Sequence, residues 1–162
     1  MATVRIVSGS PFLENELSKE FEISKQKADI GIIVFKPCNE IDSKIILRES
    51  FQESYDAILS MLEAGVERIL TVGGFSTIQG ERWKSLGRRW EPENGNSINS
   101  VEGLSHLILE VILRSKSNES RMYSAKLEKE PTSKWLAQKI RMILANEDSN
   151  FREHQGITHI ID

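Results

Sequence analysis

The sequence predicts a single α+β domain, with a mixed or largely antiparallel sheet of short strands and about three amphipathic helices. Four short strand-like segments precede the first convincing helix, and the connections between residues 20 and 48 are too short for the crossover helices that parallel strands need. Three later segments repeat apolar residues at helical spacing. An α/β three-layer architecture is the alternative, and it requires the front strands to be parallel.

The front third of the chain is predicted to form strands. In residues 3–8 and 20–24, apolar side chains recur at every second residue, which is typical of a strand with one face exposed to solvent. Residues 30–35 are almost continuously apolar, so we expect a central strand buried on both faces. The polar residues 25–29 have the length of a hairpin connection, and residues 44–48 are predicted to form the fourth strand.

A capping box predicts that the first helix begins at Ser50, because Glu53 follows three residues later. The apolar residues behind it recur at helical spacing: Phe51, Tyr55, Ile58, Leu59 and Leu62. Gly65 supplies the left-handed residue that ends such a helix. Residues 66–72 are then predicted to form a strand.

The last third of the chain predicts two more helices and two strands. One helix begins near Asn99, and Thr132 caps the other. Residues 121–127 alternate as a strand does, and residues 156–161 are expected to form an edge strand that is free to pair with a neighbour. No repeat or linker divides the chain, so residues 1–162 are predicted to be one globular domain. Within it, residues 75–100 are a long polar segment and residues 147–162 a candidate terminal arm.

Composition excludes several classes of protein. The net charge of −3 argues against binding nucleic acid over the whole surface, and the single Cys38 excludes a disulfide framework. No apolar run reaches the length of a membrane span, and no secretory leader is recognisable at Met1. We therefore expect a cytoplasmic protein, or one of the host cytoplasm if the source is viral.

Basic residues and tryptophans are concentrated at residues 82–90, within the long polar segment 75–100. Guanidinium and ammonium groups neutralise phosphates, and indoles stack on bases, but tryptophan and arginine are also enriched at protein interfaces. The acidic chain favours an interface or a structural role over nucleic acid. The candidate interface or nucleic-acid-binding residues are Arg82, Trp83, Lys84, Arg88, Arg89 and Trp90.

A pair of glycines directly after the strand predicted at 66–72 is a candidate anion site. Glycine amides, together with a helix that would begin near Thr77, could hold an anion in a loop at the end of a strand. The candidates are Gly73, Gly74, Ser76 and Thr77. No phosphate-binding fingerprint accompanies them, so an ordinary turn is the favoured interpretation.

No catalytic constellation is recognisable in the sequence. His154 and His159 lack the spacing of helical metal ligands and are expected in a surface tail, and Cys38 has no histidine near it in sequence. We therefore predict no catalytic residue, no metal and no cofactor.

Together these observations favour a non-enzymatic, self-associating structural or interaction protein, such as an assembly, virion or scaffold subunit. Its partner would be a second copy or another protein, and residues 82–90 would be able to contact nucleic acid. The alternative is a small α/β ligand-binding domain or enzyme that acts on an anionic or phosphorylated small molecule.

Overall fold

The computed structural model describes residues 1–8, 10–34, 43–73, 101–127, 130–147 and 151–160. Its strands are β1 (Thr3–Val7), β2 (Glu22–Ile23), β3 (Ile30–Val34), β4 (Arg68–Gly73), β5 (Arg121–Lys126), β6 (Phe151–His154) and β7 (Ile157–Ile160). Its helices are α1 (Pro11–Leu17), α2 (Ser43–Glu63), α4 (Val101–Ser115) and α5 (Ser133–Leu144).

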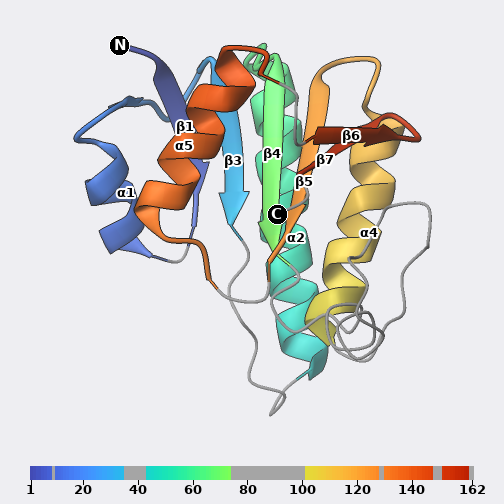
Figure 1. Ribbon diagram of the computed structural model, residues 1–162. Coiled ribbons are helices and arrows are strands. Elements are labelled where there is room, and N and C mark those ends of the chain that lie inside the picture. The colour runs from blue at the N-terminus through green and yellow to red at the C-terminus, as the bar shows by residue number, and fades with distance from the viewer. Residues whose placement is uncertain (9, 35–42, 74–100, 128–129, 148–150, 161–162) are drawn as a thin grey trace, which may run out of the picture.

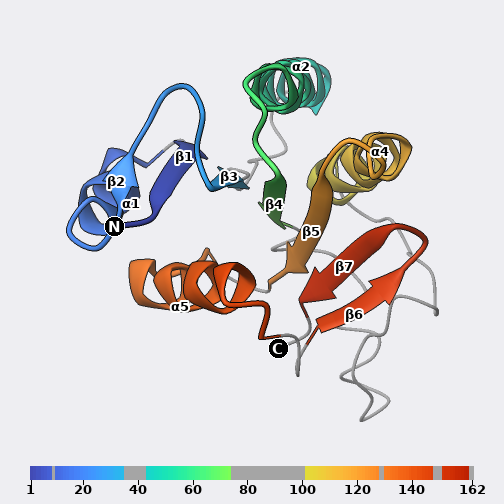
Figure 2. The ribbon, with the colours of Figure 1, turned by 90° about the horizontal axis from the view of Figure 1, so that it is seen from above.

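The strands form one seven-stranded sheet in the order β2-β1-β3-β4-β5-β7-β6 (Figure 1). Every neighbouring pair is parallel except β6 and β7. Figure 2 shows α2 and α4 on one face of the sheet and α1 and α5 on the other. The architecture is therefore α/β, as the alternative prediction had it. The α+β prediction was only partly right, because the sheet is mixed but largely parallel.

The front strands are parallel despite their short connections because β2 is only two residues long. It pairs with the first half of β1, through Thr3 and Val4, so it ends near the edge where β3 begins. Residues 24–29 pass across the start of β1, where the Asp29 amide donates to the Thr3 carbonyl. No crossover helix is needed for so short a strand. The predicted hairpin between residues 20–24 and 30–35 was wrong, since both strands pair with β1.

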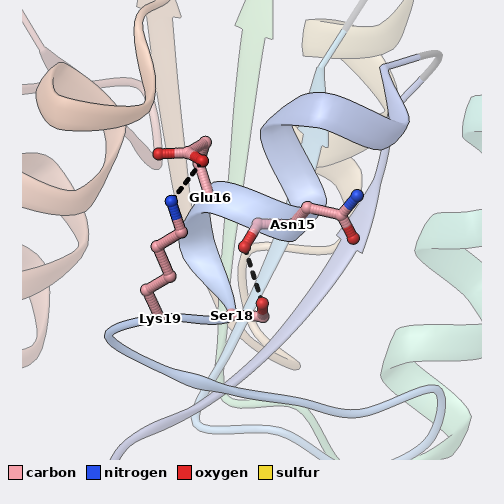
Figure 3. Close-up of polar contacts among 4 residues, drawn as sticks. All are labelled: Asn15, Glu16, Ser18 and Lys19. Carbon is pink, nitrogen blue, oxygen red and sulfur yellow. Dashed lines mark hydrogen bonds and ion pairs between the residues drawn. The ribbon is translucent and has the colours of Figure 1, made fainter.

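Helix α1 was not predicted. Ser10 is its N-cap, with its side-chain oxygen accepting from the Leu13 amide at 3.3 Å, and Pro11 occupies the first turn. A serine followed by proline was therefore the overlooked start signal. Leu13 and Leu17 face the sheet. Beyond its last turn, Lys19 pairs with Glu16 at 2.5 Å and the Ser18 hydroxyl donates to the Asn15 carbonyl at 2.6 Å (Figure 3).

Helix α2 includes residues 44–48, which were predicted to be a strand. A short apolar run has no period of its own that separates strand from helix, and here it extends the following helix toward its N-terminus. Ser50 therefore lies inside the helix, and the predicted capping box was wrong. The end of the helix was right: Gly65 has a φ of 75°, and the Val66 amide donates back to the Met61 carbonyl.

Alternate residues of the central strands face two separate cores. Leu70 and Val72 of β4 point toward α1 and α5, where they meet the buried side chains of Leu136 and Ile140. Ile69 points the other way and packs with Ile58 of α2. A parallel sheet covered on both faces explains why these strands are apolar almost throughout.

The last third of the chain follows the prediction in most elements, because α4, β5, α5 and β7 all form. Strand β7 is not at the edge, however. It lies between β5 and β6, so it is not free to pair with a neighbour. Strand β6 was missed; it joins β7 through a tight turn at Gln155 and Gly156, whose φ angles are 51° and 83°. Among the described helices, none is both long and apolar enough to span a membrane.

Candidate functional site

A row of buried polar side chains crosses the sheet on the face covered by α2 and α4. Thr71 of β4 lies beside Ser124 of β5, and Ser124 lies beside His159 of β7. All three are buried. They share a face because each stands two residues after an apolar residue of the core under α4, and strand side chains repeat with period two. Polar groups buried in register on three strands require hydrogen-bond partners, and the Thr71 hydroxyl finds one in the Tyr123 carbonyl, to which it donates at 3.4 Å.

Helix α4 supplies a carboxylate to this row. Glu110 follows Leu109 and precedes Leu113 by three residues, and both leucines pack in the same core, so the glutamate also lies on the buried side. Its Oε1 atom accepts from the Ser124 hydroxyl at 2.9 Å. The same oxygen lies 2.6 Å from the Lys126 Nζ. We call Glu110, Ser124 and Lys126 the Glu110 cluster.

Lys126 places the cation of this cluster at the carboxyl edge of the sheet. It is the last residue of β5, in register with Gly73, the last residue of β4. The Leu127 amide continues the ladder by donating to the Gly73 carbonyl at 3.0 Å. The Lys126 side chain is 12% exposed and that of Glu110 is 2% exposed. The pair is thus almost dry, and because the Lys126 Nζ itself has almost no exposed surface, the exposed part of this side chain is its aliphatic chain.

Burial lowers the pKa of Lys126 below its usual value of 10.5, since a charged amine loses hydration in this environment. The Glu110 carboxylate opposes the shift, and the positive charge of Arg114, one turn further along α4, adds to it. The opposing charge does not restore the ordinary pKa. Lys126 is consequently an amine that loses its proton more readily than an exposed lysine does.

The structure describes few of the site residues that the sequence predicted. Gly73 is buried at the end of β4, beside Lys126. The other anion-site candidates, Gly74, Ser76 and Thr77, lie outside the described residues. So do all six candidates of the basic segment, namely Arg82, Trp83, Lys84, Arg88, Arg89 and Trp90.

The histidines near the C-terminus were interpreted wrongly as parts of a surface tail. His159 is 3% exposed in β7, and His154 is half-buried in β6. Within the described part of the chain, no three histidine, cysteine or acidic side chains come close enough to hold a metal ion.

Sequence reasoning missed the Glu110 cluster. A charged residue in the middle of the apolar stripe of a helix was the available signal, since Glu110 stands between Leu109 and Val111. Ser124 and Lys126, two apart on a strand, formed the matching polar face. Only the packing of α4 on β5 brings Glu110 into contact with Ser124 and Lys126.

No protein-family model matches the chain, and no curated protein matches it. A similar solved structure is that of RMD from Pseudomonas aeruginosa complexed with NADPH, with a TM-score of 0.58 at 9% sequence identity. The match covers 78% of this chain and 53% of that chain, so this chain spans about half its length. At this identity the likeness shows the fold alone.

Proposed function

We propose that this chain is an α/β ligand-binding domain that takes a small anionic molecule at the carboxyl edge of its sheet. The observation that carries the proposal is the strand order. Strand β1 lies between β2 and β3, so the chain turns to one side after β1 and to the other side after β3. In open parallel sheets, ligands bind in the crevice outside the carboxyl ends of the strands at such a point.

The helices that follow these strands support the same location. Helix α1 follows β1 on one face of the sheet, and α2 comes between β3 and β4 on the opposite face (Figure 2). Connections that leave toward opposite faces separate above the strand ends, and this separation creates the crevice in doubly wound folds.

Phosphate-bearing ligands are common at this edge of doubly wound folds, so an anion is the class of ligand that the fold favours. Lys126 ends β5 at the same edge, with β3 and β4 between β5 and β1. Three strand spacings place it roughly 14 Å from the end of β1, because neighbouring strands lie about 4.8 Å apart. A phosphorylated metabolite of nucleotide size can span this distance. The NADPH bound to RMD is one such molecule, which makes NADPH a suitable first probe.

Thermal unfolding in the presence of single candidates tests the proposal. The panel contains NADPH, nucleoside mono- and diphosphates, sugar phosphates and inorganic phosphate. A ligand at one hundred times its Kd stabilises the folded state by about 2.7 kcal/mol, which raises the Tm by roughly 5–10 °C for a chain of this size. If no phosphorylated compound raises the Tm at millimolar concentration, the proposal is overturned.

Matched variants locate the site. Gly73→Val places a branched side chain beside Lys126, and Lys126→Met removes the cation, so both should reduce the ligand-induced shift. Lys139→Met is the control, since Lys139 is also a buried lysine but lies on α5, over the Trp135 ring at 5.5 Å. An equal loss of the shift in all three variants would mean that the ligand does not bind at the carboxyl edge.

A further inference from the structure

We draw no further inference here: the strongest candidate, the outer face of α4, where Val111 is 56% exposed beside the half-buried Ile108 and Ile112, carries nothing because nothing among the described residues shows what covers it.

Discussion

Gly31 of β3 lies against Met61 of α2 so closely that a Cβ atom added to the glycine would collide with the Met61 sulfur. Both residues are buried, and Met61 belongs to the core between α2 and the sheet. The missing side chain at Gly31 therefore lets α2 lie close to the strand. Glycine is otherwise unfavourable in a central strand, and close approach of another element is the usual reason for it.

Gly31→Ala should destabilise the fold by about 1–3 kcal/mol, because Met61 must leave its packed position. Met61→Ala alone should cost about 2–5 kcal/mol through the cavity that it creates. The double variant should cost less than the sum, since the smaller side chain makes room for the new methyl group. Urea unfolding of the four proteins measures the coupling, and strictly additive losses would contradict the close approach.

Gly65→Ala should lower the free energy of unfolding by about 1 kcal/mol, since an L-residue at a φ of 75° is strained. No atom lies within 4 Å of the added Cβ, so the loss is conformational and involves no clash. Gly65→Asn is the matched control, because asparagine tolerates the left-handed region and should lose less. Equal losses in the two variants would show that the backbone conformation is not the cause.

Substitutions of Glu110 and Lys126 should have strongly coupled effects on the free energy of unfolding, because the two side chains form a buried ion pair. Lys126→Met leaves a buried carboxylate without its cation and is expected to cost about 3–5 kcal/mol. Adding Glu110→Gln removes that charge while keeping an acceptor for Ser124, so the double variant should be more stable than Lys126→Met alone. Denaturant unfolding at neutral pH measures the cycle. A double variant that is less stable than both single variants would count against the pair.

The lowered pKa of Lys126 predicts how stability changes with pH. Above that pKa the folded chain holds fewer protons than the unfolded chain, whose lysine titrates near 10.5, so the contribution of Lys126 to stability rises with pH up to that value. Lys126→Arg is the reference, because arginine stays charged and keeps Glu110 paired. The free energy of unfolding of the wild type minus that of Lys126→Arg should increase from neutral pH toward 10.5. A flat difference would show that burial does not lower this pKa.

Self-association and nucleic-acid binding both remain predictions for the basic and aromatic segment 82–90, because this segment lies outside the described residues. If it mediates self-association, replacing Trp83 and Trp90 by alanine should change the oligomer size in light scattering without unfolding the protein. If it holds nucleic acid, replacing Arg88 and Arg89 by alanine should weaken binding and reduce its dependence on salt. An unchanged oligomer and an unchanged salt slope would remove both roles.

Local signals in the sequence identified most elements but not every boundary. Gly65 and Thr132 act as caps in the structure as predicted, because capping depends on residues within one helical turn. The apolar run at residues 44–48 predicts a strand when it is considered separately from the helical pattern that follows it, but in the structure it belongs to the same helix, α2. Helix α1 was missed because a short helix carries few apolar repeats, although Ser10 and Pro11 marked its start.

The largely parallel sheet and the Glu110 cluster depend on contacts that sequence patterns do not encode. Whether two strands run parallel is decided by where the chain between them packs, and the two-residue length of β2 made a crossover possible without a helix. Glu110 and Lys126 lie on different elements, and only the docking of α4 against β5 brings their charges to 2.6 Å. Periodicity within a segment reports which face is apolar, whereas the pairing of two buried faces is a property of the folded chain.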